Sequence, residues 1–224
     1  MLPLHLTPKA GRPLSVLVVG AHPDDIEIGA GGTLLSLALV HPGMQVRYLL
    51  LTGTAARQQE ASQAARAFLP DAELSFGLHR LPEGRLPAAW TQVKDTLEEL
   101  ASDCAPDLIF APWARDAHQD HRTIAEIVPT VFRDRLCWAY EIPKWDGDLG
   151  RPSVYFPLTE HTARRKVELL NTHFPSQKSR HWWDDEVFLG LARLRGIECW
   201  APYAEAFHCA KSVIVATASP GHES

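Results

Sequence analysis

The sequence lacks long hydrophobic runs and has no excess of basic residues. Hydrophobic residues make up 46% of the 224 residues, which is ordinary for a globular protein. No apolar run approaches the ~20 residues that a membrane-spanning helix needs. Residues 1–13 hold no apolar segment of signal-peptide length, and the formal charge of −5 argues against a nucleic-acid partner. We therefore expect a cytoplasmic protein with no membrane span and no bound nucleic acid.

Cysteines are few, and no two of them form a Cys-x-x-Cys pair. They are widely spaced, at Cys104, Cys137, Cys199 and Cys209. Such spacing is typical of reduced, mostly buried thiols and unlike a disulfide framework or a cysteine zinc site. The pattern agrees with a cytoplasmic location.

Apolar segments of strand length alternate along the chain with segments of helical periodicity. The expected strands cover 16–20, 45–51, 73–77, 107–112, 136–141 and 153–156, the expected helices cover 29–40, 54–69, 88–102, 122–131, 159–173 and 184–195, and 203–215 is part strand and part tail. This alternation predicts right-handed strand–helix–strand units. The expected fold is a single α/β domain over 15–215, a Rossmann-like, mostly parallel sheet with helices on both faces. An N-terminal extension at 1–14 and a C-terminal tail at 216–224 would flank it.

Two of the expected strands end in clusters of histidine and aspartate. The first cluster, His22-Pro23-Asp24-Asp25, follows the first strand, and the second, His118-Gln119-Asp120-His121, follows the strand at 107–112. Ligands of parallel α/β sheets bind outside the carboxyl ends of the strands, so both clusters should meet at one rim. Adjacent carboxylates resist burial without a cation. Because imidazole and carboxylate are ligands of catalytic zinc, the two clusters predict a metal site.

Each cluster has a simpler explanation when taken alone. The first could be an N-capped turn, and the second a helix start with surface histidines. The glycines at 29, 31 and 32 suggest a dinucleotide site, but their spacing is not G-x-G-x-x-G and the preceding carboxylates would repel a pyrophosphate. Close packing of a helix on a strand explains these glycines better. Both clusters occurring in order, each after a strand, favours the metal site.

The motifs resemble those of the PIG-L/LmbE-type N-deacetylases. Ala21-His22-Pro23-Asp24-Asp25, followed by Glu27 and the glycine-rich segment 29–33, is similar to the first signature of that family, and the second cluster is similar to its His-x-Asp-His motif. Further similar segments are Arg57 with Glu60, Lys166 to Ser176-Gln177, and Ala204-Glu205-Ala206-Phe207. The resemblance spans nearly the whole chain, from Ser15 to about Ala210.

The resemblance implies a role for each polar residue of the two clusters. His22, Asp25 and His121 would bind the metal, Asp24 would be the general base for the attacking water, His118 would polarise the substrate carbonyl and stabilise the oxyanion, and Asp120 would orient His118. The implied cofactor is Zn2+, although the same ligands suit Fe2+, Co2+ or Mn2+. The implied reaction removes the acetyl group from a small-molecule N-acetylated amino sugar, such as an N-acetylglucosamine conjugate. Acetate and a free amine would be released.

Several side chains that follow strand ends are candidates for substrate binding. These are Trp113, Arg115, Tyr140, Lys144 and Trp145, and Arg57 on the expected helix at 54–69 is a further candidate. Aromatic faces suit the CH surfaces of sugars, whereas Arg57 could equally be an exposed helix charge paired with Glu60. The short loop Thr52-Gly53-Thr54 stands where many relatives have a longer insertion that helps form the sugar pocket. This difference leaves the sugar undefined.

Two other functions remain open on the sequence alone. One is a metal-dependent amidase that cleaves a non-acetyl amide, such as a thiol conjugate. The other is a catalytically inactive relative that binds a sugar or nucleotide, although the full set of polar site residues argues against it. The sequence does not define an oligomeric state.

Overall fold

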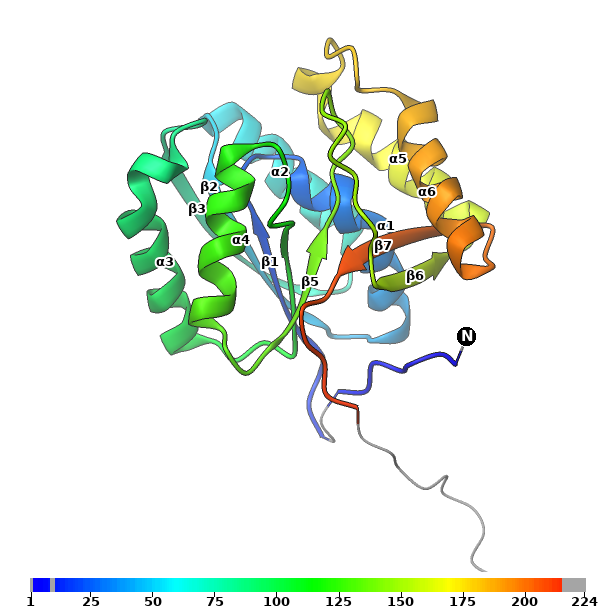
Figure 1. Ribbon diagram of the computed structural model, residues 1–224, viewed down its shortest axis with the longest axis horizontal. Coiled ribbons are helices and arrows are strands. Elements are labelled where there is room, and N and C mark those ends of the chain that lie inside the picture. Colours follow the sequence, from blue (N-terminus) through cyan, green and yellow to red (C-terminus); the bar gives the residue numbers. More distant parts are fainter. Residues whose placement is uncertain (1, 9–10, 215–224) are drawn as a thin grey trace, which may run out of the picture.

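The centre of the fold is a seven-stranded sheet in the order β3-β2-β1-β4-β5-β7-β6 (Figure 1). The computed structural model describes residues 2–8 and 11–214, so the expected tail at 216–224 lies outside the described residues. The strands are β1 (Ser15–Gly20), β2 (Gln45–Thr52), β3 (Glu73–Leu81), β4 (Leu108–Pro112), β5 (Leu136–Tyr140), β6 (Val154–Leu158) and β7 (Tyr203–His208). The helices are α1 (Asp25–Val40), α2 (Ala55–Phe68), α3 (Trp90–Asp103), α4 (Gln119–Val131), α5 (Glu160–His173) and α6 (Asp185–Cys199), with short 3-10 turns η1 (Leu86–Ala89) and η2 (Pro175–Gln177).

The strands β1 to β5 are parallel to one another, and β7 runs antiparallel to both β5 and β6. In register, Val18 of β1 lies between Tyr48 of β2 and Phe110 of β4. All three side chains are buried, because the central strands of a sheet covered on both faces have no solvent side. The expected α/β fold with a mostly parallel sheet is confirmed.

Helices cover both faces of the sheet (Figure 1). On one face α1, α2, α5 and α6 pack together over a core that includes Phe68, Phe174 and Phe188. On the other face α3 and α4 pack over a smaller core that includes Val93 and Ile127. Within the described residues, no helix is both long enough and apolar enough to cross a bilayer.

The helices α1 and α4 begin earlier than the sequence pattern predicts. The first starts at Asp25 instead of residue 29, and the second at Gln119 instead of residue 122. Each polar cluster therefore ends inside the first turn of a helix. The expected start of α1 was wrong because the glycine-rich segment is not the entry to the helix, and the chain turns into the helix already at Asp24.

The glycines inside α1 make room for neighbouring side chains. A Cβ at Gly29, Gly31 or Gly32 would lie 2.4 to 2.7 Å from Tyr140, Phe68 or Leu158, respectively. A larger residue at any of the three positions would require α1 or the facing side chain to shift. Close packing of a helix on a strand, the explanation favoured on the sequence, accounts for Gly29 and Gly32, whereas Gly31 makes room for Phe68 of helix α2.

Candidate metal centre

The two polar clusters meet at the carboxyl ends of β1 and β4, which are neighbours in the sheet. Asp24 has a φ of 116°, so the chain turns sharply from β1 into α1 at this residue. Positive φ at a non-glycine residue costs of order 1–3 kcal/mol and is concentrated at functional sites. Asp25 anchors the turn, because its Oδ2 accepts the backbone N–H groups of Ala21 and His22 at 2.9 and 2.8 Å.

Three donor atoms at this rim form a compact triangle. Nδ1 of His22 lies 3.2 Å from Nε2 of His121, and Oδ2 of Asp25 lies 3.2 Å from Nε2 of His121 and 3.5 Å from Nδ1 of His22. All three residues are buried. A tetrahedral shell with bonds of about 2.0–2.1 Å places its ligand atoms about 3.3 Å apart. The triangle therefore has the size that one small divalent ion requires.

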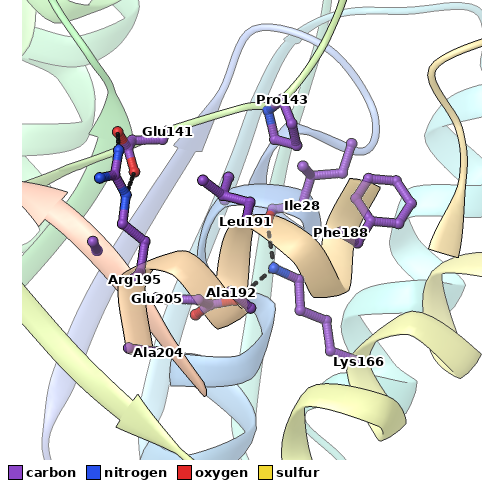
Figure 2. A pocket seen from close by; sticks show the side chains of 12 residues that line it. Ile28, Glu141, Pro143, Lys166, Phe188, Leu191, Ala192, Arg195, Ala204 and Glu205 are labelled. Carbon is purple, nitrogen blue, oxygen red and sulfur yellow. Dashed lines mark hydrogen bonds and ion pairs between the residues drawn. The ribbon is translucent and has the colours of Figure 1, made fainter. Parts of the chain in front are cut away.

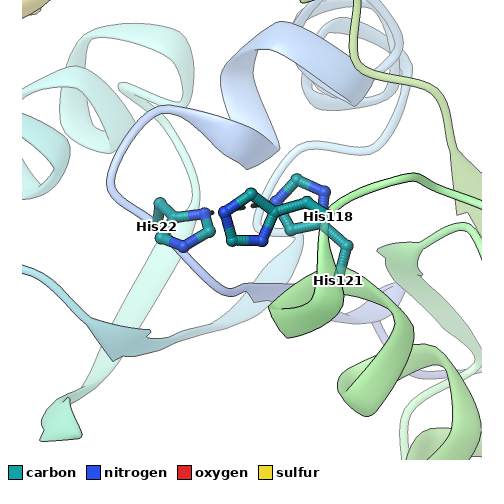
Figure 3. A group of neighbouring side chains, drawn as sticks. All are labelled: His22, His118 and His121. Atoms are coloured by element: carbon teal, nitrogen blue, oxygen red, sulfur yellow. Dashed lines mark hydrogen bonds between the residues drawn. The ribbon is translucent and has the colours of Figure 1, made fainter. Parts of the chain in front are cut away.

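A third histidine, His118, stands beside the triangle (Figure 3). Ring nitrogens of His22, His118 and His121 lie within 4.8 Å of one another, a grouping that could hold a metal ion. The His118 ring meets the His22 ring edge-on, with 4.6 Å between centroids. Its Nδ1 accepts the backbone N–H of Asp120 at 3.2 Å and so caps α4. Nε2 is the nitrogen of His118 that remains for a ligand or substrate.

The charge of Asp25 governs protonation in the triangle. Burial opposes a charge on His22, but the carboxylates of Asp25 and Asp120 outweigh it and raise the pKa of His22 to about 10. Burial likewise opposes a charge on His121, and Asp25 and Asp116 raise its pKa to about 9. The pKa of Asp25, although burial would raise it, is lowered by the two histidines. The triangle therefore favours positive charge at its centre.

Asp120 holds a different histidine from the expected one. Its Oδ2 lies 3.2 Å from Nε2 of His22, and its carboxylate accepts the N–H groups of Gly84 and Leu86 at 2.6 and 2.9 Å. The contact with His118 comes from the backbone of Asp120. The expectation that Asp120 orients His118 was wrong, because its side chain in the first turn of α4 points toward His22 and the loop after β3.

Asp116 is a site residue that the sequence analysis missed. Its Oδ2 lies 2.9 Å from Nδ1 of His121 and 3.0 Å from Nζ of Lys144. Lys144 also lies 2.7 Å from Asp148, and its side chain is only 8% exposed. A signal was available, because Asp116 follows the end of β4 as the first cluster follows β1. Lys144, expected to bind substrate, is held in ion pairs behind His121.

Arg57 reaches the first cluster instead of pairing with Glu60. Its Nη2 donates to the carbonyl of Pro23 at 3.1 Å and lies 3.4 Å from Oδ2 of Asp24. Its Nη1 lies 3.1 Å from the half-exposed carboxylate of Glu83. The alternative of an ordinary surface ion pair with Glu60 is therefore excluded.

Asp24 is a buried carboxyl beside this guanidinium. Burial and the neighbouring charge of Asp25 raise the pKa of Asp24 to about 7, although Arg57 acts in the opposite direction. A carboxyl that titrates near neutral pH is suited to accept a proton and then release it.

The other substrate-binding candidates lie in different environments. Trp113 is partly exposed and stacks on His208 with 3.8 Å between ring centroids, and Arg115 is exposed. Tyr140 is fully buried, and its hydroxyl donates to the carbonyl of Val19 at 2.7 Å. The expectation that Tyr140 lines a substrate pocket was wrong, because its ring lies beneath α1 in the core.

Comparison with known proteins connects these motifs to a family. Residues 17–132, just over half of the chain, match the model of the PIG-L family, described as GlcNAc-PI de-N-acetylase. The uncharacterized deacetylase YaiS of Escherichia coli K12 is 24% identical over 187 residues, which is 75% of this chain and 95% of that protein.

Two solved structures share the fold. The N,N'-diacetylchitobiose deacetylase from Pyrococcus horikoshii is 21% identical with a TM-score of 0.68, over 88% of this chain and 84% of that chain. GalB, the 4-carboxy-2-hydroxymuconate hydratase from Pseudomonas putida KT2440, is 16% identical with a TM-score of 0.70, over 92% of this chain and 100% of that chain. At these identities the two structures show a common fold and not a common reaction. The match over 17–132, which contains both histidine–aspartate clusters, shows that the chain belongs to the PIG-L family of de-N-acetylases.

Proposed function

We propose that this protein is a zinc-dependent N-deacetylase that releases acetate from an N-acetylated amino sugar of the N-acetylglucosamine-conjugate type. The observation that carries the proposal is the triangle of His22, Asp25 and His121, with donor atoms 3.2–3.5 Å apart. Membership of the PIG-L family supports the reaction. The fold alone would not, since a hydratase shares it.

His22, Asp25 and His121 would hold the metal. Two imidazoles and one carboxylate form a common ligand set of catalytic zinc, and they leave a coordination position for water. When bound, the ion would acidify that water and polarise the acyl carbonyl. The same donors accept Fe2+, Co2+ or Mn2+, so the choice of zinc is tested against them below.

Asp24 would move the proton during the reaction. Its carboxylate takes a proton from water as the water oxygen bonds to the acyl carbon, and gives it to the amine nitrogen as the C–N bond breaks. The products are then acetate and a free amine. The backbone turn at Asp24 and the guanidinium of Arg57, 3.4 Å away, fix the position of this carboxylate.

His118 would stabilise the oxygen that becomes negative. Burial and the neighbouring rings of His22 and His121 lower the pKa of His118, so the ring is neutral at neutral pH. Because Nδ1 accepts the N–H of Asp120, the proton of the neutral ring is on Nε2. That N–H donates a hydrogen bond to the acyl oxygen, where charge develops.

Arg57, Trp113 and Arg115 are the side chains that we propose to contact the sugar. Arg57 is close to Asp24, Trp113 offers a partly exposed ring in the loop after β4, and Arg115 is exposed in that loop. The amidase alternative uses the same reacting groups and differs only in the acyl group that is released. An inactive binding protein would have no need of Asp24 in its strained turn.

The test is acetate release by metal-stripped protein reloaded separately with Zn2+, Fe2+, Co2+ or Mn2+. The substrates are N-acetylated sugars, sugar nucleotides and glycosides. We expect metal-dependent acetate from at least one of them, released fastest with Zn2+. Faster release with Fe2+, Co2+ or Mn2+ would show that zinc is not the preferred metal. One metal ion bound per chain with no acetate, but with a larger acid released from a thiol-conjugate amide, would favour the amidase. Metal binding with no product from either class would support the inactive relative.

A further inference from the structure

A buried ion pair, Lys166 with Glu205, lies across the middle of α1 (Figure 2). Nζ of Lys166 is 2.7 Å from Oε1 of Glu205 and donates to the carbonyl oxygen of Ile28 at 2.5 Å. The carboxylate of Glu205 accepts the backbone N–H groups of Gly32 and Thr33 at 2.8 and 2.6 Å. Lys166 belongs to α5 and Glu205 to β7, so the pair ties α1 to two elements from the end of the chain.

The pair occupies both ends of one helical hydrogen bond. In a regular α-helix the N–H of Gly32 bonds to the carbonyl of Ile28, four residues earlier. Here the Lys166 ammonium donates to that carbonyl, and that N–H donates to the Glu205 carboxylate. Each charge is opposite in sign to the partial charge of the backbone group that it contacts. Lys166 and Glu205 therefore add hydrogen bonds to the backbone of α1 between its first turn and the remainder of the helix.

The first half of α1 needs such support. Glycines at positions 29, 31 and 32 each destabilise a helix interior by about 1 kcal/mol relative to alanine. A Cβ at Gly32 would lie 3.1 Å from Oε1 of Glu205, so this glycine also allows the carboxylate to approach the backbone. The residues that weaken α1 thus adjoin the ion pair that strengthens it.

We infer that the Lys166–Glu205 pair is a positioning device for the first turn of α1, the turn that carries Asp25 and follows Asp24. The pair keeps the glycine segment of α1 in helical conformation. Oδ2 of Asp25 therefore stays within 3.2 Å of Nε2 of His121. The link to catalysis rests on the proposed function, because it takes Asp25 as a metal ligand. The inference that the pair orders the helix does not rest on the proposed function.

A second buried ion pair provides a matched control. Arg195 lies 2.6 and 2.9 Å from the carboxylate oxygens of Glu141, and both pairs line one small cavity (Figure 2). The exposed fractions of the side chains are 9% and 3% in this pair, against 9% and 5% for Lys166 and Glu205. The further hydrogen bonds of Arg195 go to Glu198 and to the carbonyl of Gly150, away from α1.

The experiment compares two double variants, Lys166→Met/Glu205→Gln and Arg195→Met/Glu141→Gln. Replacing both partners avoids an unpaired buried charge. Amide hydrogen exchange is measured on the metal-free proteins, and Co2+ affinity by its visible spectrum. We expect the first variant to exchange residues 26–33 about tenfold faster than the wild type and to bind Co2+ about tenfold more weakly. The control variant Arg195→Met/Glu141→Gln should keep the exchange rates of residues 26–33 and the Co2+ affinity within about twofold of the wild type. Equal effects of the two variants, or none from the first, would overturn the inference.

Two outcomes separate this inference from the proposed function. If the wild-type protein binds no Co2+, the proposed function is wrong. The comparison of hydrogen exchange would still test whether the Lys166–Glu205 pair orders α1. If the first variant does not fold, amide hydrogen exchange in the wild-type protein tests the role of Glu205 instead. The amides of Gly32 and Thr33 must then exchange as slowly as those of β1, and fast exchange at these two amides would refute the role of Glu205.

Discussion

Oδ2 of Asp116 lies 2.9 Å from Nδ1 of His121, and Oδ2 of Asp25 lies 3.2 Å from Nε2 of the same ring. A carboxylate at one imidazole nitrogen fixes the ring and makes the other nitrogen a better metal ligand. Lys144, 3.0 Å from Asp116 and 2.7 Å from Asp148, holds this carboxylate in place. The orientation of His121 therefore depends on the loops that follow β4 and β5.

Asp116→Asn should weaken metal binding. Loss of the carboxylate frees the His121 ring, and such partners typically contribute 10–100-fold in affinity. Competition with a chromophoric chelator measures the change. Asp148→Asn is the control, since Asp148 contacts Lys144 and the N–H of Ala117. If Asp148→Asn lost as much metal affinity as Asp116→Asn, the role assigned to Asp116 would be wrong.

Asp24→Ala should lower kcat by about 10²–10⁴-fold, the usual contribution of a general base. The bound metal should remain, because the triangle of His22, Asp25 and His121 is intact. Metal content and acetate release are measured on the same sample. The exposed Asp71 offers a control in Asp71→Ala, which should change neither. Near-full activity in Asp24→Ala would show that another group accepts the proton.

His22→Ala should lose both metal and activity. Nδ1 of His22 is one corner of the triangle, and its removal leaves two protein ligands. Elemental analysis after dialysis gives the metal content, with the exposed His161 replaced by alanine as the control. A fully loaded His22→Ala protein would instead point to His118 as a ligand.

Tyr140→Phe should affect stability and not substrate binding. The hydroxyl of this buried ring donates to the carbonyl of Val19, and removing such a hydrogen bond costs about 1 kcal/mol. Urea denaturation measures the loss in the free energy of unfolding, and KM should stay constant. Trp113→Ala should instead raise KM, with little change in the free energy of unfolding. An increase of KM in Tyr140→Phe would restore its place among the substrate-binding residues.

The thiol of Cys137 should be unreactive at pH 8. Burial raises its pKa from 9.0 to about 12, so about a thousandth of the ordinary thiolate fraction is present. Folding favours the protonated thiol, so this contribution to stability is complete below pH 9 and declines as the pH rises toward 12. Reaction of the folded protein with a chromogenic disulfide measures the reactivity of the thiol. Urea denaturation of the wild type and of Cys137→Ala at pH 8 and pH 10 measures its contribution to the free energy of unfolding. Rapid labelling of the folded protein at Cys137 would contradict the burial. All four cysteines are free thiols, as the wide spacing predicted, but each is only partly buried and not mostly buried as expected.

Local sequence patterns predicted that the two clusters lie at one rim, because strand ends and residue types can be read from them. The choice of His22, Asp25 and His121 as metal ligands came from the family resemblance and stays a prediction. The sequence did not predict the partners of these residues. Asp120 faces His22, and Lys144 faces Asp116, because those contacts depend on how loops after β3 and β5 fold back. The start of α1 was also misplaced, since the backbone turn at Asp24 that begins the helix has a positive φ at a non-glycine residue, which the local pattern does not predict. Local sequence carries no record of such long-range contacts.

Glu205 lies 173 positions beyond Gly32, and their contact has a consequence for biosynthesis. The ribosome delivers β1, α1 and both histidine–aspartate clusters long before β7 emerges. Contacts between residues so far apart form late, because the intervening chain must first be ordered. A nascent or truncated chain that stops short of β7 would carry every proposed metal ligand and still lack the brace on α1. From the tenfold effect expected for the pair, such a chain should bind Co2+ about ten times more weakly than the completed chain.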